Sequence, residues 1–172
     1  TISNCDNISV RKCNIYDTGG SGIVIKGREN LVEGCTMYET GRFCVELNGG
    51  GVPVTYTPSH NRVANNHFYN FAVYNLMLYK YAVTMGRNTG NTTIGDICEK
   101  NLIHGQPNAQ GILYGGLDNL IRYNEICCVA NEIADAALIY SGRRLSEFGN
   151  LIEYNYLHDY GADFNARFKV QG

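Results

Sequence analysis

The chain has 172 residues, with 14 basic and 16 acidic side chains and a pI near 6.0. This nearly balanced charge argues against a nucleic-acid-binding protein, which usually presents a basic face. No stretch is apolar over the length that spans a bilayer, so we expect no membrane span. Asn and Gly number 20 each and Pro only 3, a composition typical of many short strands joined by turns.

A six-residue phrase recurs along the chain: an apolar residue, two variable residues, Cys or Asn, one variable residue and a second apolar residue. The six copies begin at Val10, Val32, Val63, Cys98, Ile121 and Ile152. Their Cys/Asn positions are separated by 22, 31, 35, 23 and 31 residues. A repeat of 22 or 23 residues that accepts insertions is typical of a solenoid.

Between these phrases lies a second apolar run, at residues 22–25, 43–47, 82–85, 111–114 and 137–140. Each turn should therefore contain three short strands, with Asn or Cys at one corner. Stacked turns lie about 4.8 Å apart, so amides at this corner can hydrogen-bond along the stack. The sequence lacks the patterns of a leucine-rich horseshoe, a hexapeptide helix or a β-sandwich. We predict an all-β chain that forms one right-handed parallel β-helix domain over residues 1–172, with about six turns.

Seven cysteines cannot all pair, and no paired C-x-x-C motifs suggest a zinc site. We interpret the thiols as reduced and packed as small hydrophobic side chains, including the adjacent Cys127 and Cys128. No metal and no cofactor are expected. The chain begins at Thr1 without a leader, so we expect a secreted, periplasmic or cell-surface protein only if the full-length protein carries a signal peptide.

The insertions predict where a ligand binds. They follow the second apolar run at residues 48–59, 86–95 and 141–150 and precede it at 69–80 and 127–134, whereas the Cys/Asn corner has none. Insertions at both ends of one sheet predict a groove along it, which suits a polysaccharide or oligosaccharide. The candidate substrate-binding residues on or beside this sheet are Glu46, Asn48, His60, Lys80, Tyr114, Tyr140, Arg144 and Arg167. Strand parity could instead direct Tyr114 and Tyr140 into the core.

Glycoside hydrolysis needs two carboxyl groups about 5 to 9.5 Å apart. Asp135 and Asp163 fall on successive turns, so we predict that they form this pair, with Arg143 keeping one of them ionised. Glu46 lies three turns from Asp135, about 14 Å along the axis, which is too far for a catalytic pair. Glu132 is a substitute candidate.

Two other functions stay open. A metal-independent polysaccharide lyase or epimerase could use Lys80, Tyr140, Arg143 or His60 as a base or cation. The sequence shows no acidic cluster suited to calcium. The second alternative is a carbohydrate-binding or adhesin-like solenoid without catalytic activity.

One stretch carries a more particular pattern. Residues 135–143 (DAALIYSGR) and 149–159 (GNLIEYNYLHD) are similar to a D-x-G-A-I-Y-x-G-R … G-N-x-I-x-Y-N-x-x-H-D pattern. The chain thus resembles right-handed parallel β-helix proteins of the pectin-lyase-like superfamily, in particular bacterial glycoside hydrolases and polysaccharide lyases. Ala137 and Leu138 depart from the pattern, where Gly and Ala are expected. The resemblance implies carbohydrate chemistry without fixing the reaction.

Neither end of the sequence reads as a cap. Solenoids need caps because an open end exposes unpaired strand groups. We therefore expect the chain to be a fragment of a longer β-helix with missing capping segments, or to associate edge to edge with itself.

Overall fold

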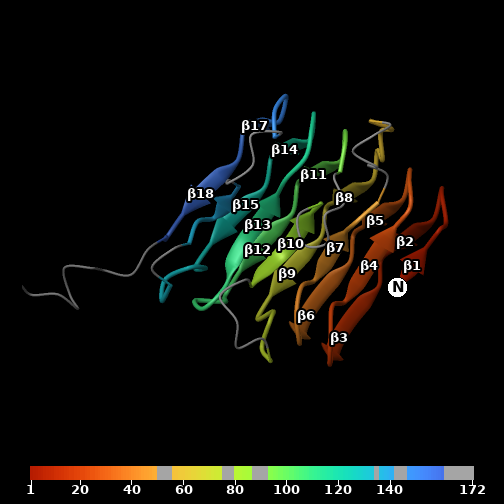
Figure 1. Ribbon diagram of the computed structural model, residues 1–172. Coiled ribbons are helices and arrows are strands. Elements are labelled where there is room, and N and C mark those ends of the chain that lie inside the picture. Colours follow the sequence, from red (N-terminus) through yellow and green to blue (C-terminus); the bar gives the residue numbers. More distant parts are fainter. Residues whose placement is uncertain (50–55, 75–79, 87–92, 134–135, 142–146, 161–172) are drawn as a thin grey trace, which may run out of the picture.

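The computed structural model describes residues 1–49, 56–74, 80–86, 93–133, 136–141 and 147–160. Within these ranges the chain forms eighteen short strands. The strands follow one another around a coil, so that every third strand lies beside its predecessor in one of three sheets (Figure 1). In this part of the chain no helix is long and apolar enough to cross a bilayer.

Each sheet contains six strands. Sheet A contains β1 (Ile2–Ser3), β4 (Ile23–Lys26), β7 (Val45–Leu47), β10 (Tyr81–Met85), β13 (Gln110–Tyr114) and β16 (Ile139–Tyr140). Sheet B contains β2 (Ser9–Arg11), β5 (Leu31–Glu33), β8 (Arg62–Ala64), β11 (Ile97–Glu99), β14 (Leu120–Arg122) and β17 (Leu151–Glu153). Sheet C contains β3 (Asn14–Thr18), β6 (Thr36–Thr40), β9 (His67–Tyr69), β12 (Leu102–His104), β15 (Glu125–Cys127) and β18 (Tyr156–His158). Neighbouring strands pair in parallel, which confirms the predicted β-helix of six turns with three strands per turn.

The core is a set of apolar rows that run along the axis. On sheet C, Phe68 lies in register between Met37 of the preceding turn and Ile103 of the following turn, and all three are fully buried. Successive side chains of a strand point to opposite faces, so on the three-residue strands of sheets B and C the middle residue points inward while its neighbours face outward. The two apolar positions of the repeated phrase hold these inward-facing residues.

The corner between sheets B and C carries the predicted amide ladder. Asn101 Nδ2 donates to Asn124 Oδ1 at 2.9 Å and to the carbonyl of Val63 at 3.1 Å, while its Oδ1 accepts from the backbone N–H and Nδ2 of Asn66. Two residues join the strands at this corner in every turn. An insertion here would break a ladder in which each amide bonds to the turns on both sides.

A second ladder lies at the corner between sheets A and B, and it contains one carboxyl group. Asn61 Oδ1 accepts from Asn30 Nδ2 at 3.1 Å, and Asn61 donates its own backbone N–H to Asp96 Oδ1 at 2.7 Å. Asp96 in turn donates its N–H to Asn119 Oδ1 at 2.9 Å. Burial raises the pKa of Asp96 to about 7. The sequence predicted an amide ladder only at the Cys/Asn corner, although Asn also recurs at this second corner in four copies of the repeat, at Asn30, Asn61, Asn119 and Asn150.

All seven cysteines are free thiols. Cys35, Cys44 and Cys98 are buried in the core as predicted. The prediction was wrong for Cys5 and Cys128, which are exposed because they lie in connections rather than on inward strand positions.

The outer faces of sheets B and C carry polar and aromatic rows. On sheet B, the Glu99 carboxylate is almost completely buried between the guanidinium groups of Arg62 and Arg122. On sheet C, Nε2 of His67 lies 2.7 Å from Nε2 of His104, so one nitrogen donates and the other accepts. This bond holds the ring of His67 half-buried against the outer face of the sheet.

Candidate functional site on the outer face of sheet A

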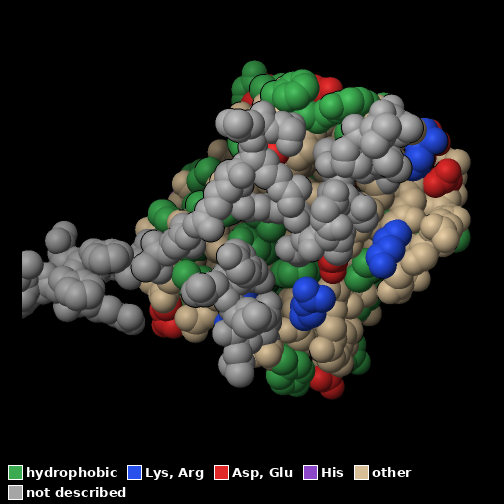
Figure 2. All heavy atoms as spheres, viewed as in Figure 1, with side chains coloured by type: hydrophobic (Ala, Val, Ile, Leu, Met, Phe, Trp, Pro, Cys, Tyr) green, Lys and Arg blue, Asp and Glu red, His purple; other side chains and the backbone are tan. Residues whose placement is uncertain are grey.

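Variable connections flank sheet A on both sides. Between β7 and β8 the chain takes fourteen residues and between β4 and β5 only four, whereas every connection between sheets B and C has two. The predicted positions of the insertions are therefore confirmed. Figure 2 shows scattered charged side chains on the face that it presents, without a large patch of one sign among the coloured residues.

A polar group that we call the Glu46 cluster (Ser21, Glu46, Asn48 and Thr84) lies on the outer side of this sheet. The carboxylate of Glu46 accepts a hydrogen bond from Asn48 Nδ2 at 2.7 Å, through Oε1. Its Oε2 accepts from the hydroxyl of Ser21, in the preceding turn, at 3.3 Å. Only 6% of Glu46 is exposed. Its neighbours Val45 and Leu47 point into the core, so the strand alternation itself directs Glu46 outward.

Thr84 extends the cluster by one turn. It is the register partner of Glu46, so the two residues lie about one strand spacing, ~4.8 Å, apart. Thr84 is fully buried, and its Oγ1 has no hydrogen-bond partner in the described ranges. Buried hydroxyl groups in folded proteins are nearly always paired, so this one is an exception.

An apolar patch adjoins the cluster on the same face. Phe43, Tyr81 and Leu113 are buried in a group separate from the interior core, and Tyr140 packs against them. The rings of Phe43 and Tyr81 have their centroids 6.2 Å apart and are tilted by 44°. Leu113 and Tyr140 continue the register row of Glu46 and Thr84, so the face changes from polar to apolar along the axis.

The structure separates the two tyrosines that the sequence left ambiguous. Tyr140 lies in the apolar patch on the outer side, whereas Tyr114 packs against the interior core. Tyr114 is the register partner of the buried Met85, and its half-buried ring therefore belongs to the core. The core alternative holds for Tyr114 and not for Tyr140.

The remaining predicted residues are spread around the sheet. Lys80 is half-buried directly before β10, and His60 is exposed at the corner between sheets A and B, next to the second amide ladder. Sheet A has β10 and β13 between β7 and β16, so Glu46 is three strand spacings, about 14 Å, from the sixth turn. The other predicted residues, Asp135, Arg143, Arg144, Asp163 and Arg167, lie outside the described residues.

Sequence reasoning did not single out Ser21, Phe43 and Tyr81. The positions of Phe43 and Tyr81 could have been found by aligning the second apolar runs turn by turn, because each lies two residues before one of the register partners Val45 and Val83. That alignment was obscured by the 35-residue spacing between the third and fourth phrases.

The family comparison agrees with this architecture. The family model of the right-handed β-helix region matches residues 1–169. The chain belongs to this family. The match extends over all six turns, so the whole β-helix has the predicted right hand. No curated protein and no solved structure matches the chain. Family membership establishes the fold, and the reaction has to be argued from the side chains of the site.

Proposed function

We propose that this β-helix binds a polysaccharide along the outer face of sheet A and cleaves it as a glycoside hydrolase. The observation that carries the proposal is the Glu46 cluster, in which a carboxylate, an amide and a hydroxyl group gather on the outer side of sheet A and are joined by hydrogen bonds. The site lies between the two variable corners, where binding residues concentrate in solenoids.

The chemistry of the cluster suits a sugar. A carboxylate has about four acceptor positions, of which Asn48 and Ser21 fill two on Glu46, so it can also accept from ligand hydroxyls. The apolar patch beside them offers ring surface to the non-polar face of a pyranose, with the half-buried Tyr140 as its more accessible member.

For cleavage we propose Asp135 and Asp163 as the carboxyl pair. One would protonate the glycosidic oxygen, and the other would activate water or attack the anomeric carbon, so that water is added across the broken bond. Arg143 would favour the ionised form of its neighbour. Within the described part of the sheet A face Glu46 is the one acidic residue, so its role in this proposal is to bind substrate.

Binding can be tested separately from cleavage by affinity electrophoresis in gels that contain neutral or uronic-acid polysaccharides. The test variant is Glu46→Gln, and the matched control is Glu33→Gln on sheet B. We expect that at least one polysaccharide retards the wild type and the control equally. The affinity of Glu46→Gln for it should be lower by about tenfold or more, because the charge-assisted hydrogen bonds between the carboxylate and the ligand are lost. Equal retardation of all three proteins, or retardation by no polysaccharide, would contradict the assignment of this face.

A further inference from the structure

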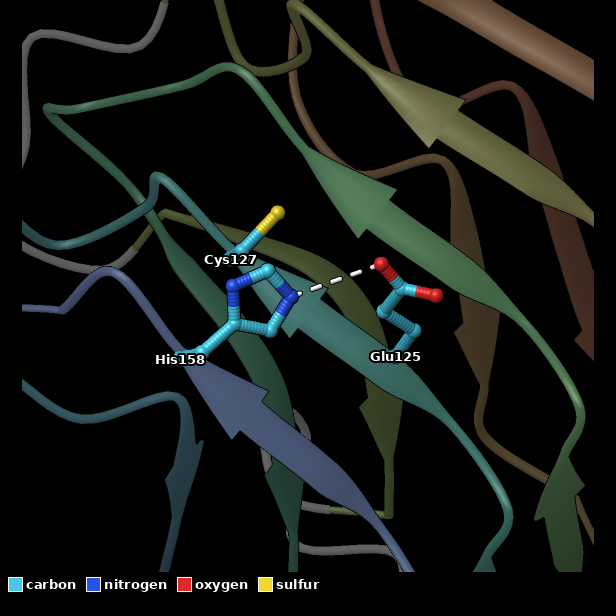
Figure 3. A group of neighbouring side chains, drawn as sticks. All are labelled: Glu125, Cys127 and His158. Carbon is cyan, nitrogen blue, oxygen red and sulfur yellow. Dashed lines mark hydrogen bonds and ion pairs between the residues drawn. The ribbon is translucent and has the colours of Figure 1, made fainter.

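Three potential metal ligands lie together on the outer face of sheet C, on the two neighbouring strands β15 and β18. Glu125 and Cys127 belong to β15, and His158 belongs to β18 (Figure 3). One ligand atom from each residue lies within 4.8 Å of the other two. None of these residues belongs to the sheet A site, so the group is independent of the proposed function.

The backbone places these side chains on one face. Glu125 and Cys127 are two residues apart on a strand, so they point the same way, while Ile126 between them is buried in the core. Cys127 is the register partner of His158 on the next turn. Glu125 and His158 have side chains that are 50% and 25% exposed, so an ion could reach the group from solvent.

A fourth residue orients the histidine. Asp159 Oδ2 lies 3.0 Å from His158 Nδ1, which favours the tautomer that carries its proton on Nδ1. The lone pair of Nε2 is then directed to the side of Glu125, whose Oε1 lies 3.4 Å away. Metal-binding histidines nearly always donate their other ring N–H to such a carboxylate or to a carbonyl. This contact is an observation independent of the grouping of the three ligands.

The donor set selects the type of ion. A thiolate, an imidazole and a carboxylate suit zinc, whereas calcium and magnesium prefer oxygen ligands alone. Zinc bonds of about 2.1 Å in tetrahedral geometry put N and O donors about 3.4 Å apart, which is the separation found between His158 and Glu125. The sulfur of Cys127 lies within 4.8 Å of the other two ligand atoms, and it would have to move closer to them to form a zinc–sulfur bond of about 2.3 Å.

We propose that Glu125, Cys127 and His158 bind one Zn²⁺ ion, with Asp159 as a positioning residue and water at the fourth coordination position. The ion would link the fifth and sixth turns of the solenoid across β15 and β18. It would therefore bind the folded chain and not the unfolded one, and it would raise the unfolding temperature.

The test is titration of the metal-free, reduced chain with Zn²⁺, followed by calorimetry and thermal unfolding, and titration with Co²⁺ followed by absorption. We expect one ion per chain, a rise in unfolding temperature, and a thiolate-to-cobalt charge-transfer band. Cys127→Ser should lose the band, and His158→Gln should lose tight binding. Asp159→Asn should weaken affinity about tenfold or more while it keeps the band, because only the orientation of the histidine is lost.

Two variants serve as matched controls. Cys128→Ser removes the exposed neighbouring thiol, and Asp17→Asn changes an exposed aspartate on β3, at the other end of the same sheet. Both should bind as the wild type does. Absence of stoichiometric binding would overturn the proposal, as would a charge-transfer band that persists in Cys127→Ser but disappears in Cys128→Ser. A cooperative thermal unfolding transition of each metal-free variant would show that its fold is intact.

Discussion

Replacing Asp96 by Asn should stabilise the β-helix, and more so as the pH rises. Asp96 occupies a rung of the ladder between sheets A and B where the neighbouring turns carry Asn61 and Asn119. Its Oδ2 stands where those residues have an amide nitrogen, and it has no partner in the described part of the chain. Ser59 Oγ donates instead to the carbonyl of Ile94, at 3.1 Å. An amide at this position regains the donor that the ladder lacks.

The magnitude follows from the pKa of the aspartate. Burial raises the pKa of Asp96 from its ordinary value of 3.8 to about 7, although the hydrogen bond that the Asn61 N–H donates to its Oδ1 opposes the rise. Between these values the unfolded chain loses a proton that the folded chain retains, so folding stability falls as the pH increases. The difference amounts to about 4 kcal/mol above pH 7, of which about 2–3 kcal/mol should develop between about pH 5 and pH 8.

The assay is urea unfolding of the wild type and Asp96→Asn at several pH values across this interval. The difference in unfolding free energy between Asp96→Asn and the wild type should grow by about 2–3 kcal/mol between about pH 5 and pH 8, because only the wild type carries the titrating carboxyl group. The converse variant, Asn66→Asp in the other ladder, should be destabilised most at high pH. Parallel pH profiles for the wild type and Asp96→Asn would refute the reasoning, as would a variant less stable than the wild type at high pH.

Two further substitutions test other parts of the framework. Asn101→Ala should lower the unfolding free energy by about 3 kcal/mol in urea titrations, because it removes the acceptor of the buried Asn66 N–H and one of the two donors to Asn124 Oδ1. Glu99→Gln should cost about 1–2 kcal/mol at neutral pH. Burial alone would raise the pKa of Glu99, but hydrogen bonds from Arg122 and Arg62 lower it, so the difference from wild type should disappear as the pH falls through that depressed pKa.

Less buried positions of the same residue types provide the controls. Asn14→Ala on β3 removes an exposed side chain, and Glu33→Gln on β5 neutralises a half-buried carboxylate that forms a 3.3 Å ion pair with Arg11. Each should change stability by less than about 1 kcal/mol. Losses of unfolding free energy as large as those of Asn101→Ala and Glu99→Gln would contradict the conclusion that burial determines the effect.

The repeated phrase contains most of the information about the fold. Its apolar positions hold inward-facing residues such as Val63 and Phe68, and its Asn residues form the ladder between sheets B and C. Register then follows, because an amide such as Asn101 bonds to its equivalents in the preceding and the following turn. The recurrence of Asn does not reveal Asp96, because an aspartate of nearly the same size takes the place of asparagine at this position.

The functional residues were harder to predict because they do not repeat. Glu46 could be placed on the outer face by strand parity, whereas its contact with Ser21 depends on how two turns stack. The group of Glu125, Cys127 and His158 was missed, although Cys127 and His158 have the same 31-residue separation as Asn124 and Asn155 of the ladder. Counting residues by turn would have brought the ligands together.

The most direct test of the proposed function is digestion of a polysaccharide panel by the wild type and by Asp135→Asn. Reducing ends and the ultraviolet absorbance of unsaturated uronides should be followed together. We predict that the wild type releases reducing ends without this absorbance and that the variant releases almost none. Growing absorbance would instead indicate a lyase. Release of no product from any polysaccharide to which the wild type binds would contradict catalysis and identify a binding solenoid.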